Sequence, residues 1–194
     1  MKNLTLIIFL SFITIGGIQA QQLKAFGFKG GLNISTIGNN SSGLTTQLGY
    51  NLGIYSMIRP YQEVGLQAEL LVSKIGGRYE NISNLRLNYT YLTLPVFTNI
   101  YFAEGAALEM GFQFGYLLSA TQVDAGNKID ISDDVKDWDF GGVVGLSYIK
   151  PYGSVGLRYV LGISNTNSGS RSAEVKFKNK VLQLYIAKNI SSPK

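Results

Sequence analysis

The sequence predicts an all-β fold, an eight-stranded antiparallel up-and-down transmembrane β-barrel. Three observations lead to this prediction. Large apolar residues alternate with small or polar ones through most of the 194-residue chain, with the period of two that is typical of strands. The apolar face is bulky and continuous, whereas the other face is mostly glycine, serine and alanine. Short and long connections between the alternating segments also follow each other strictly, as in outer-membrane barrels.

The alternation defines each predicted strand, and the stretch ALEMGFQFGYLLSA shows it most clearly. Leu108, Met110 and Phe112 share one face there, whereas Glu109 and Gly111 share the other. In water, such a face would leave a very large apolar surface exposed. In a bilayer it meets lipid, and closure of the sheet leaves no unpaired backbone edge in hydrocarbon. The eight predicted strands span residues 24–35, 46–58, 64–72, 85–102, 107–120, 138–148, 154–164 and 181–189.

The fourth predicted strand fits the pattern least well. Apolar residues occupy both parities between Leu85 and Phe102, and Pro95 has no backbone N–H to donate to a sheet. We therefore predict a β-bulge near Pro95 that exchanges the two faces of this strand. The alternative assigns residues 85–91 to the preceding connection.

The N-terminal residues predict a cleavable secretory signal peptide. Lys2 gives a short positive region, residues 4–15 form an apolar run, and Ala20 ends a cleavage site. A membrane anchor is the alternative, but the apolar run is short and two glycines follow it. The predicted organisation is a signal peptide over residues 1–20 and a barrel domain over residues 21–194, in a protein exported to the bacterial outer membrane.

The connections between the predicted strands alternate in length. Outer-membrane barrels have short periplasmic turns and longer external loops, and an even strand number brings both chain ends to the periplasmic side. The longer connections here are also richer in Asn, Ser, Asp and Gly. The short connections are residues 59–63, 103–106 and 150–153, and the long ones are residues 36–44, 75–84, 121–137 and 166–173.

The composition argues against an enzyme. Cysteine and histidine are both absent, which removes the thiolate nucleophile, the usual neutral-pH general base and two common metal ligands. One acidic connection resembles a hard-cation site, but its spacing does not match an EF-hand, so we expect a solvated loop, no metal and no cofactor. The net charge of +5 comes without a basic patch among exposed aromatics, so we expect no nucleic-acid partner. The acidic residues are Asp124, Asp130, Asp133, Asp134 and Asp137.

Parity places five charged side chains inside the predicted barrel: Lys29, Glu69, Glu109, Asp139 and Arg158. Charges in a narrow lumen must be paired or hydrated, because removing one alone from water costs several kcal/mol. An eight-stranded barrel has an interior just wide enough for side chains to fill. We therefore expect a structural ion network that plugs the lumen. The alternative is a gated polar pathway for a small solute.

Three lysines lie near the external end of the last predicted strand. Lys176, Lys178 and Lys180 share one parity in the segment EVKFKNK. Ammonium groups at a membrane surface attract lipid phosphates. We predict contacts with outer-membrane lipid here, with lipopolysaccharide as one candidate. The alternative is a solvated extension of the strand.

Six motifs occur in the order expected for a known family. FGFKGGLNIS follows the signal peptide, YLTLPVF and GFQFGYLLSA come next, and DFGGVVGLSY, LRYVLGISNT and LQLYIAKNI follow. In these motifs the chain resembles the PorT-like eight-stranded outer-membrane barrels of Bacteroidetes. The resemblance implies the fold and the outer-membrane location, and it allows a link to protein secretion. Two hypotheses follow: a non-enzymatic structural or interaction barrel that engages a protein partner through loops or turns, and a narrow channel for small solutes.

Overall fold

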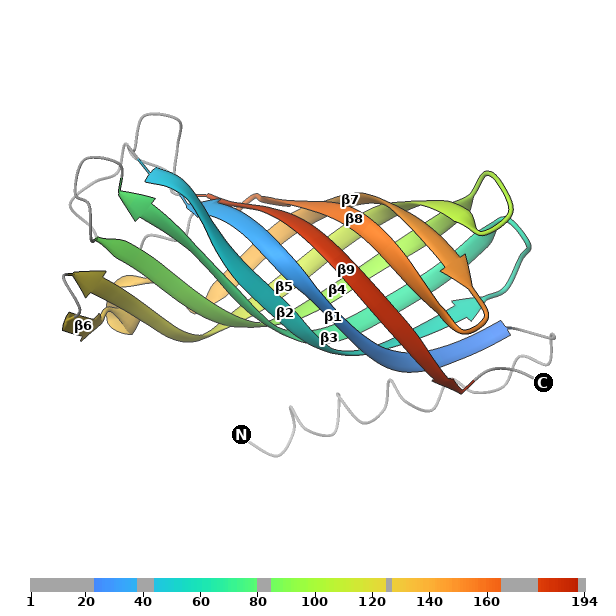
Figure 1. The fold of residues 1–194 in the computed structure, drawn as a ribbon, viewed down its shortest axis with the longest axis horizontal. Helices are drawn as coiled ribbons and strands as arrows, with labels where there is room; N and C mark the ends of the chain where they lie inside the picture. The colour runs from blue at the N-terminus through green and yellow to red at the C-terminus, as the bar shows by residue number, and fades with distance from the viewer. Residues whose placement is uncertain (1–22, 38–43, 80–84, 125–126, 165–177, 192–194) are drawn as a thin grey trace, which may run out of the picture.

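Eight antiparallel strands close into a barrel, and one short extra strand extends a hairpin beyond it (Figure 1). The computed structural model describes residues 23–37, 44–79, 85–124, 127–164 and 178–191. The predicted eight-stranded antiparallel barrel is confirmed. The predicted signal peptide lies outside the described residues.

The barrel strands form an up-and-down meander. Each strand pairs with its neighbours in the chain, β1 pairs with β9, and the pairing of β4 with β5 completes the ring. The ring therefore has no open edge within the bilayer, where an unpaired backbone group is costly. The barrel strands are β1 (Leu23–Ile37), β2 (Leu44–Arg59), β3 (Val64–Tyr79), β4 (Arg86–Tyr101), β5 (Ala106–Asp124), β7 (Trp138–Lys150), β8 (Gly153–Gly162) and β9 (Asn179–Ser191).

Several strands extend beyond the segments that were predicted from alternation. β3 runs to Tyr79 and pairs with β4 as far as Arg78, although residues 75–84 were expected to form a loop. Likewise, the end of β5 pairs with the short strand β6 (Asn127–Asp130), which leads into a 3-10 turn, η2 (Ser132–Asp134). Antiparallel hydrogen bonding continues in these segments without an apolar face, so alternation alone does not reveal them.

The outer face of the barrel is a continuous apolar surface. Phe112 is 55% exposed, Leu157 48% and Leu48 66%, and their neighbours on the same parity are similar. Aromatic residues lie near both ends of this face, with Tyr116 against Trp138 at the external end and Tyr61 at a short turn. Apolar bands with aromatic girdles are the lipid-facing surface of outer-membrane barrels. Among the residues that the structure describes, no helix is long and apolar enough to cross a membrane.

The predicted face switch near Pro95 is wrong. Burial alternates along β4 without a break, and Pro95 points inward like Tyr91 and Phe97. β4 accommodates the proline through a gap in its pairing with β3, between the pair Ala68–Val96 and the pair Leu71–Thr93, with no change of register. The apolar residues of both parities have a different cause, because the lumen itself is partly filled by aromatic side chains of this strand.

In the pairing of β4 with β5, the irregularity lies on β5. Thr90 pairs with Ser119 and Tyr91 pairs with Leu117, so Leu118 is the extra residue of a bulge. The inward-facing parity of β5 changes at this point, from Leu117 to Ala120. The alternative that placed residues 85–91 in a loop is also wrong, since β4 begins at Arg86.

Candidate functional site

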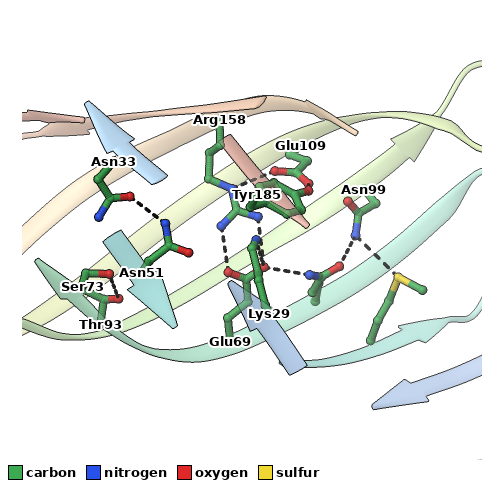
Figure 2. Close-up of polar contacts among 12 residues, drawn as sticks. Lys29, Asn33, Asn51, Glu69, Ser73, Thr93, Asn99, Glu109, Arg158 and Tyr185 are labelled. Atoms are coloured by element: carbon green, nitrogen blue, oxygen red, sulfur yellow. Dashed lines mark hydrogen bonds and ion pairs between the residues drawn. The ribbon is translucent and has the colours of Figure 1, made fainter. Parts of the chain in front are cut away.

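A buried network of charged side chains crosses the lumen (Figure 2). β1 supplies Lys29, β3 supplies Glu69, β5 supplies Glu109 and β8 supplies Arg158. The period of two turns each of these residues inward on its strand. The structure thus brings together four of the five charged residues that parity places in the lumen.

Arg158 and Glu69 form the centre of the network. The guanidinium donates from Nη1 to Glu69 Oε2 at 2.9 Å and from Nη2 to Glu69 Oε1 at 3.0 Å, which is the bidentate geometry of a strong pair. The Lys29 ammonium donates to Glu69 Oε1 at 2.7 Å, and the Gln67 amide donates to the same oxygen at 2.8 Å. Glu69 therefore accepts from two cations and one amide.

Glu109 completes the network on the other side of Arg158. Arg158 Nε donates to Glu109 Oε2 at 2.8 Å, and the Tyr185 hydroxyl donates to Glu109 Oε1. Aromatic rings cover both cations: Lys29 Nζ lies 3.4 Å from the centre of the Tyr185 ring, and Arg158 Cζ lies 4.2 Å from that of Phe97. These contacts place aromatic faces where water would otherwise solvate the charges.

The network is balanced in charge and closed to solvent. It contains two cations and two carboxylates, and the four side chains are at most 1% exposed. A buried charge is tolerated only where partners replace its hydration, and here each charge has at least one such partner. Both carboxylates are held by cations, and neither faces an open cleft, so the geometry suits a plug better than an acid–base pair.

Two glycines make room for these large side chains. A Cβ at Gly156 would lie 2.5 Å from the Tyr185 ring, and a Cβ at Gly145 would lie 3.0 Å from Glu109 Oε2. Small residues on the inner face thus lie beside large side chains of neighbouring strands, as expected for a filled eight-stranded barrel.

Asp139 lies apart from the network, in contrast to the sequence-based expectation. It accepts hydrogen bonds from the Asn179 amide at 2.9 Å and from the Ser164 hydroxyl, near the external end of the barrel. β7 pairs Asp139 with Gly115 and Gly145 with Glu109, so Asp139 is six residues along its strand from the level of the network. Parity gives the inward direction of Asp139 but not its height in the barrel.

An apolar cluster fills the lumen on the external side of the charges. Val135, from the connection after η2, is 7% exposed and reaches into this cluster, with Ile131 packed beside it. Hydrogen bonds hold the start of η2 to β5, from Ile131 N to Ala120 O at 3.0 Å and from Ala120 N to Ser132 Oγ at 3.0 Å. Sequence reasoning missed this layer, and the apolar residues on both parities of β4 are the signal for it. The barrel residues are Ile75, Leu87, Tyr89, Tyr91, Leu117, Ala120, Val143, Val160 and Val181.

A third layer lies toward the short turns. The Asn99 amide and the Tyr101 hydroxyl contact Met57 Sδ at 3.8 and 3.7 Å, and the Arg59 guanidinium covers the Tyr101 ring at 3.7 Å. A cavity of about 80 Å³ remains at this mouth of the barrel, beside Asn189. Aromatic, polar and apolar side chains thus occupy the lumen on both sides of the ion network.

The other predicted sites are only partly described. Lys180, at the external end of β9, and Lys178, just before the strand, share the outward parity, whereas Lys176 lies outside the described residues. In the acidic connection, Asp130 accepts from the Ser132 backbone N–H at 2.9 Å. Within the described parts of the chain, no three acidic side chains are grouped as metal ligands.

The comparisons with known proteins agree with this architecture. A family model described as "Outer membrane protein beta-barrel domain" matches residues 19–168. The chain belongs to this outer-membrane β-barrel family. The family places the protein in the bacterial outer membrane. No curated protein sequence matches the chain.

Two solved structures have the same fold. The attachment invasion locus protein Ail of Yersinia pestis is similar with a TM-score of 0.54 and 12% identity, over 87% of this chain and 99% of that chain. Neisserial surface protein A is similar with a TM-score of 0.52 and 13% identity, over 85% of this chain and 97% of that chain. At this identity the likeness concerns the fold alone.

Proposed function

We propose that this member of the outer-membrane β-barrel family is a non-enzymatic, PorT-like barrel with a closed lumen and a structural or interaction role. The observation that carries the proposal is the set of hydrogen bonds from Arg158 to Glu69 and Glu109. Three strands far apart in the sequence are joined there across the interior of the barrel. These hydrogen-bonded side chains occupy the space in the lumen that a solute would need.

The layers on either side of the network support the same reading. Val135 and its neighbours close the external end with apolar groups, which gives an ion no replacement for its hydration shell. The non-enzymatic reading rests on the pairing of Glu69 and Glu109 with cations at 0–1% exposure. A carboxylate that is held in this way is not available as a general base to a substrate in solvent.

The interaction role is supported by the hairpin that β6 adds beyond the barrel (Figure 1). All four residues of β6 are exposed, and Ile129 is 54% exposed in spite of its apolar side chain. β6 ends the sheet order, so its outer edge has no strand neighbour in the described chain. An exposed edge strand is a surface to which another protein chain adds readily.

Entry of small ions into vesicles tests the closed lumen. Vesicles with wild-type protein should admit ions no faster than protein-free vesicles. Replacement of Lys29 and Glu69 together by alanine removes one cation and one carboxylate, so it opens space without leaving a net charge, and entry should become faster. Arg86→Gln, at the external end of β4, serves as the control. Rapid entry through the wild-type barrel would instead favour a narrow channel for small solutes.

A further inference from the structure

A cross-strand row at the end of the barrel with the short turns contains two lysines. Lys150 of β7 lies opposite Gly153 of β8, and Gly153 lies opposite Lys188 of β9. Adjacent strands are about 4.8 Å apart, so the two lysine backbones are roughly 10 Å apart. The middle residue is glycine, so it adds no side chain of its own between them. A groove of about 340 Å³ lies at this place on the outer face.

The next rows toward the centre of the membrane are apolar. Tyr148, Val155 and Ile186 form the first of these rows, and they are 47%, 54% and 67% exposed. Leu146, Leu157 and Leu184 form the row after it and are similarly exposed. The groove therefore has a cationic end and continues as an apolar track over the same three strands.

The cationic end has an excess of positive charge. Lys188 is exposed and has no acidic partner among the described residues. Lys150 Nζ lies 2.9 Å from Glu104 Oε1, but the Glu104 side chain is 93% exposed, and an exposed pair of this kind is weak. An ammonium group has three donors, so Lys150 can hold Glu104 and a second acceptor together. Tyr152, in the turn, is 76% exposed and borders the groove.

We propose that this groove binds an anionic phospholipid of the periplasmic leaflet. The phosphate would lie between the ammonium groups of Lys150 and Lys188, and an acyl chain would follow Val155 and Leu157 toward the membrane centre. The short turns mark the periplasmic side of an outer-membrane barrel. The site is therefore at the opposite end of the strands from Lys178 and Lys180. The groove lies on the outer face, so lipid can bind there whether or not the lumen conducts.

Binding of phosphatidylglycerol to the folded protein in non-ionic micelles tests the proposal, with native mass spectrometry to measure occupancy. Lys150→Gln combined with Lys188→Gln should weaken binding roughly thirtyfold, since each lysine near a membrane surface contributes on the order of 1 kcal/mol and a factor of ten corresponds to about 1.4 kcal/mol. The control, Lys128→Gln with Lys136→Gln, removes the same charge from exposed external positions and should leave the affinity within twofold. Circular dichroism verifies that both variants are folded.

A second measurement locates the lipid. Phosphatidylglycerol with a spin label on its headgroup should broaden the backbone amide signals of residues 153–155 and 186–188 more than those of the turn at residues 60–63. Equal broadening at both places would overturn the proposal, as would unchanged affinity in the Lys150 and Lys188 double variant. Binding of diacylglycerol as tight as that of phosphatidylglycerol would show that chains alone are recognised. Equally tight binding of inorganic phosphate would show that no lipid is required, and either result would also contradict the proposal.

Discussion

Arg158 on β8 and Glu69 on β3 meet across the lumen through two hydrogen bonds of 2.9 and 3.0 Å, although 89 residues separate them in the sequence. Both side chains are fully buried, so water cannot solvate either charge when its partner is removed. Removal of one member of such a pair is costly, whereas removal of both together costs much less. This asymmetry distinguishes a packed ion network from a hydrated lumen.

Arg158→Met should lower the free energy of unfolding by about 3–5 kcal/mol, because it leaves Glu69 and Glu109 buried without their main cation. The free energy of unfolding of Arg158→Lys should lie between those of the wild type and Arg158→Met, since lysine keeps the positive charge but cannot donate two parallel hydrogen bonds to one carboxylate. Urea titrations of the barrel refolded in lipid vesicles measure these values, with Arg86→Met on the exposed end of β4 as the control. A loss of less than about 1 kcal/mol in Arg158→Met would show that water reaches the carboxylates.

Lys29 and Glu69 should be coupled energetically. Their atoms Nζ and Oε1 are 2.7 Å apart, with both side chains buried. In a double-mutant cycle with Lys29→Met and Glu69→Gln, we expect a coupling free energy of about 0.5–3 kcal/mol, because residues in one network do not contribute independently. The same vesicle titrations give the four unfolding free energies. Additive effects of the two substitutions would contradict the network.

Two glycines on neighbouring strands should respond differently to alanine. In Gly156→Ala the new Cβ would lie 2.5 Å from the Tyr185 ring, whereas in Gly142→Ala it meets nothing within 4 Å. Overpacking of this kind typically costs about 1–3 kcal/mol, so Gly156→Ala should be destabilised by that amount. Gly142→Ala should be close to wild type or slightly more stable. Equal unfolding midpoints for the two variants would mean that Tyr185 does not occupy the lumen as described.

A charged residue near the middle of the lipid-facing surface should destabilise the barrel. Phe112→Arg or Leu157→Arg should destabilise the barrel by roughly 2–4 kcal/mol if the residue lies at the midplane. Tyr61→Arg, in a short turn, should cost about 0–1 kcal/mol because an arginine there reaches the interface. Refolding titrations in vesicles compare the three variants. If Phe112→Arg is as stable as Tyr61→Arg, the assignment of the outer face is wrong.

The ion pair at the short turns should respond to pH. The hydrogen bond and the charge of Lys150 lower the pKa of the exposed carboxyl of Glu104 below its ordinary value. Because the pKa of Glu104 is lower in the folded state, the pair stabilises the fold at pH values above the pKa of the unfolded state. This stabilisation is lost as the pH falls through the pKa of the folded state. An NMR titration of the Glu104 carboxyl should show its pKa rise in Lys150→Gln. An identical titration curve in both proteins would exclude the pair in solution.

Much of the barrel could be predicted from the sequence because a strand reveals its faces through alternation. The inward direction of Lys29, Glu69, Glu109 and Arg158 follows from parity alone. Their meeting does not, because the height of each residue in the barrel depends on the stagger between strands. Asp139 illustrates this limit, since it points inward but lies opposite Gly115, away from Glu109.

The bulge on β5 was not predictable for a related reason. Pro95 of β4 is the residue that interrupts the sequence pattern, yet the bulge is at Leu118 of β5. Leu117 and Leu118 are both apolar, so the change of face there leaves no mark in the pattern. The aromatic side chains of Tyr91 and Phe97 point into the lumen because the closed barrel has space for them there. That space depends on all the strands of the barrel together. Local sequence patterns predict the direction of a side chain but not the volume that it fills in the lumen.

The conductance of the purified wild-type barrel in a planar lipid bilayer tests the closed lumen most directly. The packing of Arg158 against Glu69 and Glu109, with apolar residues on the external side, predicts no stable open level. The variant with Lys29 and Glu69 both replaced by alanine should show openings at the same protein concentration. A large, stable conductance of the wild-type protein would contradict the plug.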